Sequence, residues 1–219
     1  MTTPLFHYYH VYADGNYTTP VAEHFNTLRV YGLTDALDSI QVGIVGSDEN
    51  REAAKQLLAQ VCPTAQVCAE AESGWEQTTL NELWAFSHDN EGYVSYAHTK
   101  GASRDDPIDR PWRRDMTYHN FVNWQHVVNL LSLGQHAVGC HWIKSPAANP
   151  DFGWGGMFGG NFWWSRLDLL RQNCHPQMHT RFAAEHWLFQ LSEVLPMTEA
   201  TITDLNPQPI QEPYLKSDW

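Results

Sequence analysis

The stretch Phe6–Ala13 reads FHYYHVYA, and it decides the fold class from the first residues of the chain. Aromatic and β-branched side chains dominate it, which is typical of a β-strand. The polar residues Asp14–Asn16 follow and favour a tight turn. Apolar residues at helical spacing come next, over Val21–Tyr31. The chain therefore begins with a strand, a turn and a helix.

The same alternation continues through the first hundred residues. Strands are predicted at Ile40–Val45, Ala65–Ala71 and Tyr93–Ala97, and helices at Asp48–Val61, with Ser47 as its cap, and Glu76–Phe86. Alternating strands and helices are typical of βαβ units. We therefore predict an α/β fold, with a mostly parallel, Rossmann-like sheet flanked by helices.

The second half of the chain is less regular. It predicts helices at Trp112–Leu133 and Arg181–Leu191, strands at Ala137–Trp142 and near Met157, and a helix-like run over Ser165–Gln172. No strong linker interrupts the chain, so we expect one domain over residues 1–205 and a proline-containing tail over 206–219. Residues 1–110 and 111–205 would then form the two walls of a cleft.

Charge and composition exclude some classes of function. The formal net charge is −12, from 13 basic and 25 acidic residues, which argues against nucleic acid or an anionic membrane as a partner. No apolar run approaches the ~20 residues of a membrane span, and Met1–Tyr12 lacks the features of a signal peptide. The 4 cysteines form no CxxC pair. We expect a cytoplasmic protein with reduced thiols and no transmembrane segment.

A basic cluster stands out in this acidic chain. It consists of Arg104, Arg110, Arg113 and Arg114. A concentrated positive patch is a candidate anion site. Alternatively, it is the solvated start of a helix, compensated by neighbouring aspartates such as Asp109.

Two short motifs carry the chemistry. His98-Thr99-Lys100-Gly101 closes a predicted core strand, and ligands of parallel sheets sit beyond the carboxyl ends of strands. The segment Gly159–Trp164 reads GGNFWW and combines glycines that allow close approach, an amide and flat aromatic faces. These groups suit a polar, ring-shaped ligand such as a sugar. The alternative is a tight turn followed by a buried aromatic cluster.

Taken in order, these segments resemble a family of glycosyltransferases from bacterial polysaccharide gene clusters and some eukaryotes. Its members carry HTKG, W-R and GNFWW segments in the order in which they occur here, over about Phe6–Leu191. The resemblance implies a GT-A-like nucleotide-sugar fold. It also implies transfer of a sugar from a nucleotide donor, without identifying the donor or the acceptor. We expect a UDP-sugar as the donor and a glycan or lipid-linked saccharide as the acceptor.

One departure from that pattern concerns the metal. Many GT-A enzymes hold a divalent cation with Asp-x-Asp after the fourth strand, whereas this chain has His98-Thr99-Lys100 there. A requirement for a divalent metal is therefore left open, and no metal ligand is assigned.

The transfer needs charge neutralisation at the leaving diphosphate. Lys100 is the expected cation, helped by His98 and by Arg113 or Arg114, while Thr99 would also contact the donor. Alternatively, Lys100 is a solvated turn lysine.

The sugar and the nucleotide need their own contacts. Gly159, Gly160 and Asn161 are expected to hold the sugar hydroxyls, with Trp163 or Trp164 against a ring face. The nucleotide is expected to meet Tyr12, Ala13 and Asp14 at the end of the first strand.

The acceptor needs a base if the reaction inverts the anomeric centre. Glu185 is the predicted base, with His186 second; alternatively, Glu185 pairs with Arg181 four residues earlier. A different class of function also stays open, a non-catalytic nucleotide- or sugar-binding module. A zinc hydrolase that uses some of the 12 histidines is a third possibility.

Overall fold

The computed structural model describes residues 3–104, 106–144, 156–173, 175–176, 183–189 and 202–206. In the first half, the elements are β1 (Leu5–Tyr12), α1 (Thr18–Val30), α2 (Leu33–Ala36), β2 (Ser39–Val45), α3 (Asp48–Val61), β3 (Ala65–Ala71), α4 (Gln77–Asp89) and β4 (Tyr93–His98). Strands and helices alternate as predicted, and α3 and β3 have the predicted bounds.

The second half contains shorter elements. They are α5 (Asp109–Thr117), the π-helix η1 (Tyr118–Val122), α6 (Trp124–Ser132), β5 (Ala137–Gly139), β6 (Trp142–Lys144), β7 (Gly156–Phe158), β8 (Trp163–Arg166), α7 (Leu167–Leu170), α8 (Ala183–His186), the 3-10 helix η2 (Trp187–Phe189) and β9 (Ile202–Asp204). The ends of the predicted helix over Arg181–Leu191 lie outside the described residues, as does the predicted tail after Asn206.

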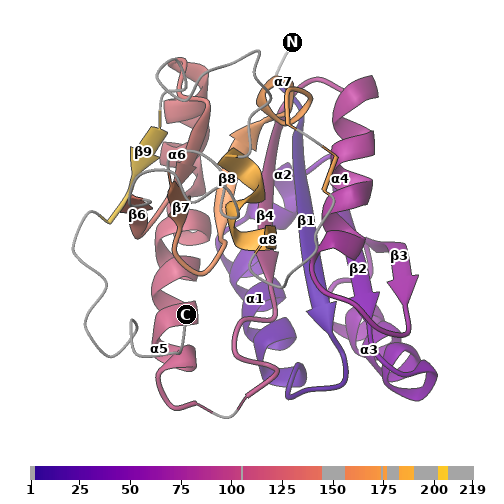
Figure 1. The fold of residues 1–219 in the computed structure, drawn as a ribbon. Coiled ribbons are helices and arrows are strands. Elements are labelled where there is room, and N and C mark those ends of the chain that lie inside the picture. The colour runs from indigo at the N-terminus through magenta and orange to yellow at the C-terminus, as the bar shows by residue number, and fades with distance from the viewer. Residues whose placement is uncertain are drawn as a thin grey trace.

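One mixed sheet organises the molecule (Figure 1). Its described strands run in the order β3-β2-β1-β4-β8-β5-β9. The first four are parallel, with His10 of β1 opposite His98 of β4, whereas β8 is antiparallel to both of its neighbours. A separate antiparallel pair joins β6 and β7. The predicted α/β class, a mostly parallel sheet flanked by helices, is confirmed.

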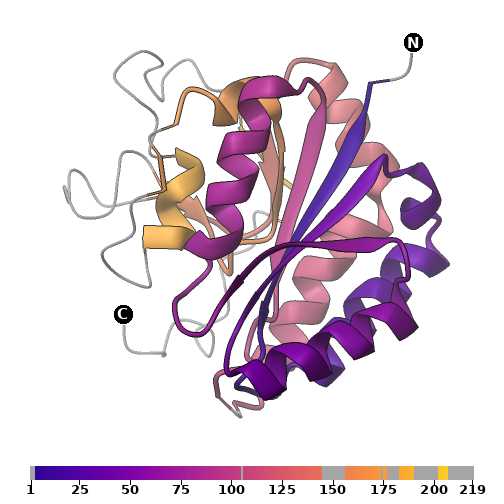
Figure 2. The same cartoon turned by 90° about the vertical axis from the view of Figure 1, so that its right-hand side faces the viewer.

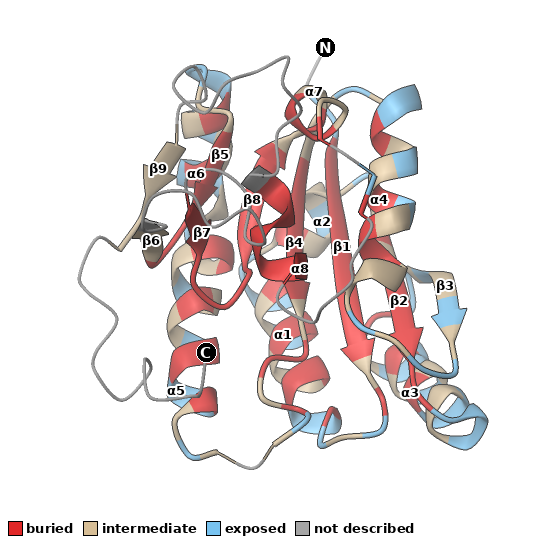
Figure 3. Cartoon of the chain, viewed as in Figure 1, coloured by how far each residue is buried: buried red, intermediate tan, exposed pale blue. Residues whose placement is uncertain are grey.

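Helices cover both faces of this sheet (Figure 2). On one face, α1, α3, α5, η1 and α6 bury apolar side chains with those of Tyr9 and Val11. On the other, α4, α7 and α8 pack with Tyr8 and Tyr96. Figure 3 shows that the central strands are buried along most of their length, while β3 at the edge is largely not. Burial on both faces explains the near-continuous apolar sequence of β1.

Two predicted helices differ in the structure. The segment Trp112–Leu133 is not one helix, because η1 interrupts it between α5 and α6. Within η1, the carbonyl oxygen of Asn120 accepts a hydrogen bond from Trp164 Nε1 at 3.0 Å. The helix-like run from Ser165 begins instead inside β8, and a single turn of helix, α7, follows it.

Candidate functional site

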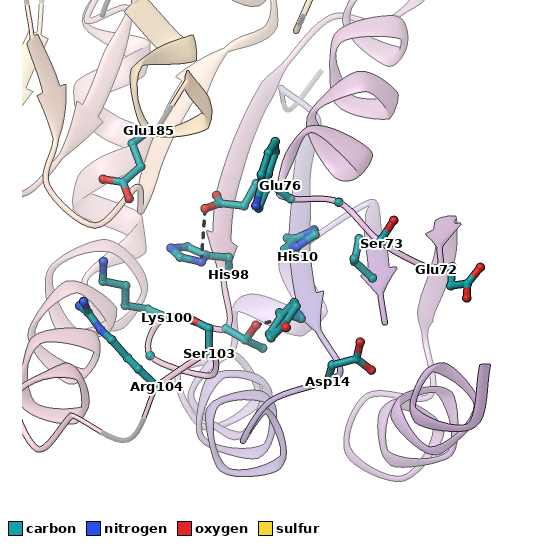
Figure 4. Close-up of a pocket in the computed structure, with 16 residues that line it drawn as sticks. His10, Asp14, Glu72, Ser73, Glu76, His98, Lys100, Ser103, Arg104 and Glu185 are labelled. Atoms are coloured by element: carbon teal, nitrogen blue, oxygen red, sulfur yellow. Dashed lines mark hydrogen bonds and ion pairs between the residues drawn. The ribbon is translucent and has the colours of Figure 1, made fainter. Parts of the chain in front are cut away.

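A cavity of about 390 Å³ opens where β1, β2, β3 and β4 end at their carboxyl termini (Figure 4). We call it the strand-end cavity. It is lined from the first half by His10, Tyr12, Asp14, Val45, residues 72–76, His98–Gly101, Ser103 and Arg104, and from the second half, among the described residues, by Glu185. Ligands of parallel sheets bind at this position, and the volume lies within the usual range of small-molecule sites.

The HTKG segment forms a tight turn at the floor of this cavity. Lys100 N–H donates to His98 O at 2.7 Å, and Ala102 N–H donates to Thr99 O at 3.0 Å. The hydroxyl of Thr99 accepts a hydrogen bond from the Tyr12 N–H at 2.9 Å, which ties the end of β4 to the end of β1. The predicted residues Tyr12, His98, Thr99 and Lys100 therefore meet at one place.

Lys100 is almost buried, with a relative exposure of 6%. Its Nζ lies 4.2 Å from the ring centroid of Trp112, a cation–π contact supplied by α5. Its carbonyl oxygen accepts a hydrogen bond from Arg113 at 2.9 Å. Helix α5 thus holds both the side chain and the main chain of this lysine, which is not a solvated turn residue.

Glu76 organises the centre of the site. Its Oε2 accepts hydrogen bonds from the Tyr96 hydroxyl and from Asn161 Nδ2, both at 2.7 Å. Its Oε1 lies 3.6 Å from His98 Nδ1, an ion pair when that ring is protonated. On the other side of the ring, His98 Nε2 donates to Gly160 O at 3.0 Å. The His98 ring is therefore oriented from both sides.

Glu185 reaches the cavity from α8. It is 7% exposed, and its Oε2 has no hydrogen-bond partner among the described residues. Figure 4 shows its carboxylate pointing towards the side of the cavity where the Lys100 and Arg104 side chains end. A buried carboxylate oxygen without a partner is costly to keep, so it is available to a ligand group. Arg181, the predicted alternative partner, lies outside the described residues.

A neutral histidine, His10, lies near Glu76 and His98. Burial lowers the pKa of His10 to about 4; Glu76 partly opposes the shift, and the nearby His98 adds to it. His10 Nδ1 hydrogen-bonds the Thr79 hydroxyl at 2.8 Å. His10 thus contributes polarity without charge at neutral pH.

The loop after β1 lines another part of the strand-end cavity, through Asp14. Asp14 is exposed, and its Oδ1 accepts hydrogen bonds from Asn50 Nδ2 at 2.9 Å and Ser47 N–H at 2.8 Å, which lower its pKa. The predicted side-chain cap by Ser47 is absent from α3, and the N–H of Ser47 itself donates to Asp14. Gly15 is required here, because a Cβ would lie 2.0 Å from Ala102 O in the turn after HTKG.

The basic cluster does not gather at the cavity. Arg104 lines it, but its guanidinium also makes two hydrogen bonds to Asp109. The predicted phosphate contacts Arg113 and Arg114 point to Glu23 of α1, as Arg110 does. The helix explains this outcome, since residues at spacings of three and four share one face of α5.

The GGNFWW segment supports the site from behind and does not line it. Trp163 and Trp164 are 1% and 0% exposed and, as neighbours on a strand, point to opposite faces of the sheet. Gly159, Gly160 and Asn161 are buried as well. In place of the predicted sugar contacts, the Asn161 amide joins Glu76, Trp163 Nε1 and the carbonyl of Ala184 in α8. Ala13, predicted to meet the nucleotide, is also buried.

Sequence reasoning missed part of the lining. Trp75, in the loop after β3, is 43% exposed and lines the cavity. His10 and Glu72, which also line the cavity, were given no role. For Glu76 and Thr79 two interpretations were left open, lining of the cleft or capping of a helix, and of the two only Glu76 lines the cavity. The position of His10 within β1, and of Glu72 directly after β3, was the available signal, because these strands share one sheet edge.

Two further findings concern the described residues alone. Among the residues that the structure describes, no three His, Cys, Asp or Glu side chains gather in a way that would hold a metal ion. Within the same part of the chain, none of the helices combines the length and apolar character needed to cross a membrane.

The fold and the site define an α/β protein with a polar cavity at the carboxyl edge of its parallel strands. Residues 8–181 match the family described as Domain of unknown function (DUF8361), and the chain belongs to that family. No curated protein matches the chain.

Two solved structures are similar at low identity. One is the crystal structure of a 4-diphosphocytidyl-2C-methyl-D-erythritol synthase, 10% identical, which covers 93% of this chain and 89% of that chain with a TM-score of 0.45. The other is described as a nucleotide-diphospho-sugar transferase from Desulfovibrio desulfuricans G20, 15% identical, which covers 86% and 73% with a TM-score of 0.40. At TM-scores below 0.5, neither likeness supports a function for this chain.

Proposed function

We propose that this protein is a glycosyltransferase that moves a sugar from a nucleotide-sugar donor to a glycan or lipid-linked saccharide acceptor. One observation carries the proposal: the strand-end cavity brings together the cations Lys100 and Arg104 and the carboxylate of Glu185, whose Oε2 has no hydrogen-bond partner among the described residues. A transfer of this kind needs a positive group at the leaving phosphate and a base at the attacking hydroxyl.

The donor nucleotide would bind at the ends of β1 and β2. Tyr12 and Val45 lie there, and the exposed Trp75 offers an indole face on the same cavity. Stacking on an aromatic side chain suits a nucleobase. Asp14, held by α3, would accept a hydrogen bond from a ribose hydroxyl. UDP-sugars are the first donors to test.

The diphosphate would meet Lys100 and Arg104. The Lys100 ammonium is held against Trp112 and so stays close to one position, which reduces the reorganisation needed when charge develops. Both ring nitrogens of His98 already face protein groups, Gly160 O and Glu76, so His98 would line the wall beside the diphosphate without donating to it. No three carboxylate or histidine side chains fit a metal ion among the described residues, and no step is assigned to one.

Glu185 would act as the base. Its free Oε2 would take the proton of the acceptor hydroxyl while that oxygen forms a bond to the anomeric carbon. The bond from that carbon to the diphosphate oxygen breaks, and the nucleoside diphosphate leaves with the electron pair. Attack opposite the leaving group inverts the anomeric centre.

Calorimetry with UDP, GDP, dTDP and their sugars, with and without Mn²⁺, tests the binding step. We expect one nucleotide family to bind and to raise the melting temperature, since a ligand of the native state stabilises it. Trp75→Ala should weaken that binding. The absence of binding by all of these nucleotides and nucleotide sugars contradicts the proposal.

Turnover separates an enzyme from a non-catalytic binding module. We expect Lys100→Ala to lower kcat roughly 100- to 1,000-fold, and Glu185→Gln to lower it roughly 100- to 10,000-fold. Lys55→Ala and Glu91→Gln are matched surface controls with 30% and 77% exposed side chains, and they should keep full activity. Nucleotide binding without release of nucleoside diphosphate in any acceptor mixture favours the non-catalytic module.

A further inference from the structure

A second cavity, of about 310 Å³, lies between α1 and the α5–η1 segment. We call it the α1–α5 cavity. Its walls include Glu23 and Tyr31 from α1 and its end, and Arg114, Tyr118 and Val122 from α5 and η1. This cavity lies on the face of the sheet where the helices cover Tyr9. The strand-end cavity lies elsewhere, at the carboxyl edge of the parallel strands. The proposed transferase reaction uses no residue of this second cavity directly.

Exposed aromatic side chains line both cavities. Among the described residues, the large aromatic side chains that are exposed are Tyr31 at 46%, Trp75 at 43% and Tyr118 at 53%. Trp75 lines the strand-end cavity, and both tyrosines line the α1–α5 cavity. An aromatic surface kept in contact with water is a common mark of a recognition site.

The π-helix η1 is a second, independent indication that the α1–α5 cavity is a functional site. Extra residues in a helical turn are unfavourable and occur frequently at functional sites. In this protein the π-helical turn begins at Tyr118 and ends at Val122, and both of these residues line the cavity. The irregular turn therefore shapes the wall that presents the exposed tyrosine.

Buried polar atoms without partners lie at the floor. Tyr9, His24 and Arg113 line the cavity, and the Tyr9 hydroxyl, His24 Nδ1 and Arg113 Nε have no hydrogen-bond partner among the described residues. Leaving such an atom unsatisfied costs about 1–3 kcal/mol. Polar groups that enter the floor of the cavity would remove part of that cost.

The protonation of this floor follows from its hydrogen bonds. The Ser95 hydroxyl donates to Phe6 O, so His7 Nδ1 donates to Ser95 Oγ at 2.8 Å and His7 Nε2 must accept. His24 Nε2 then donates to His7 Nε2 at 2.9 Å, which leaves His24 Nδ1 as an acceptor. Burial lowers the pKa of His24 well below its usual value, so the ring is neutral. The floor thus presents an acceptor at His24 and a donor at Arg113.

The charges of the walls argue against an anion. Glu23 lies between three guanidinium groups, at 3.0 Å from Arg110, 3.0 Å from Arg113 and 2.7 Å from Arg114. Burial opposes its ionisation, but the hydrogen bonds from these arginines outweigh burial and lower its pKa. A phosphate approaching Arg114 would therefore meet a carboxylate that already occupies the guanidinium.

We infer that the α1–α5 cavity is a second binding site, for a saccharide. Sugar rings present apolar faces to aromatic side chains, and each hydroxyl both donates and accepts hydrogen bonds. That combination matches the two tyrosine rings together with the acceptors on the walls, which are the Glu23 carboxylate and the Thr27 and Thr117 hydroxyl oxygens. Arg113 Nε is a donor without a partner among the described residues. The inference does not rest on the proposed transferase activity, because a sugar would bind this face with or without catalysis at the strand-end cavity.

Ligand-observed saturation-transfer NMR on the full chain tests this site with cellobiose, maltose, lactose and N,N′-diacetylchitobiose. At least one of these sugars should receive saturation. Tyr118→Ala and Tyr31→Ala should each raise its Kd at least about tenfold, the effect of losing one aromatic contact. Both side chains are largely exposed, so these variants should keep the fold, which circular dichroism verifies.

Two control variants make the outcome decisive. Leu133→Ala removes an exposed apolar side chain that lines neither cavity, and Trp75→Ala removes the aromatic side chain of the other cavity. Saccharide binding should survive both changes. Binding that persists in both tyrosine variants, binding lost in Trp75→Ala, or no saturation with any of the four sugars would each overturn the inference.

Discussion

Gly101 shows how tightly the turn after β4 packs against α5. Its φ is +83°, and a Cβ there would lie 2.5 Å from the Cβ of Asp109. Asp109 in turn accepts two hydrogen bonds from Arg104, so it has little freedom to move. The residue that precedes Gly101 is Lys100, and the position of this lysine depends on the close approach.

We therefore expect Gly101→Ala to destabilise the protein by about 3 kcal/mol, from backbone strain of about 1 kcal/mol plus overpacking. Gly134→Ala is the matched control, because its φ is +101° and an added Cβ has nothing within 4 Å. It should cost about 1 kcal/mol. Urea denaturation measures both values, and equal losses would show that Asp109 does not restrict the turn.

The exposed side chain of Trp75 allows a second prediction about a single residue. It is 43% exposed, so Trp75→Ala should change the free energy of unfolding by less than about 0.5 kcal/mol. Loss of a stacking surface should weaken nucleotide binding by about 1–3 kcal/mol, which raises the Kd roughly 5- to 150-fold. Isothermal titration measures the affinity, with Tyr118→Ala as the control that should leave it unchanged. Unaltered nucleotide affinity in Trp75→Ala would exclude its role as a platform.

At the scale of elements, Glu23 joins α1 to α5. It binds Arg110, Arg113 and Arg114, whose side chains are 57%, 8% and 59% exposed. Only the buried member of this trio also donates to the carbonyl oxygen of Lys100 among the described contacts. The arginine that sequence analysis assigned to a phosphate therefore acts as a support between a helix pair and the strand-end turn.

The trio allows a prediction with an internal control. Arg113→Ala should lower stability by about 3 kcal/mol, because it leaves the partly buried Glu23 and the Lys100 carbonyl short of a partner. Arg114→Ala removes a contact to the same carboxylate from a side chain that is exposed, and it should cost at most about 0.5 kcal/mol. Chemical denaturation of the two variants side by side checks this. Similar values would mean that burial does not distinguish them.

At the scale of the whole molecule, three buried histidines link stability to pH. Burial lowers the pKa of His7 to about 3, that of His10 to about 4, and that of His24 well below 6.5. Below pH 6.5 the unfolded chain therefore binds protons that the folded chain does not. Stability is complete above pH 6.5 and is lost progressively as the pH falls towards 4.

The expected slope is up to about 1.4 kcal/mol per pH unit for each histidine, or about 4 kcal/mol for the three together. Urea denaturation between pH 7 and pH 4.5 measures it. His24→Asn should reduce the proton uptake on unfolding by about one, because it removes one of the three buried rings. A free energy of unfolding that stays constant across this range would contradict the neutral state of the three rings.

Much of the first half was predictable because local pattern and burial agree there. The α3 and β3 bounds match the apolar spacing, and the rule that ligands lie beyond parallel strand ends brought Tyr12, Asp14 and Lys100 to one cavity. Sequence alone could not show that Arg113 faces α1. That direction depends on where a distant residue, Glu23, lies in the folded chain.

The second half was harder for a related reason. Trp163 and Trp164 have no polar alternation, because β8 is buried on both faces, so their composition does not distinguish a ligand surface from a core strand. Asn161 was predicted to hold sugar hydroxyls, but its amide serves other protein groups. The contributions of Trp75 and Glu76 come from a loop with little local pattern.

The place of β8 between β4 and β5 also bears on how the protein is made. A ribosome delivers the chain from its amino end, so β4 emerges long before the segment that will cover its free edge. Until Trp163–Arg166 appears, unpaired N–H and C=O groups of β4 remain open to other chains. During synthesis, we expect that edge to need protection from other chains until β8 pairs with it.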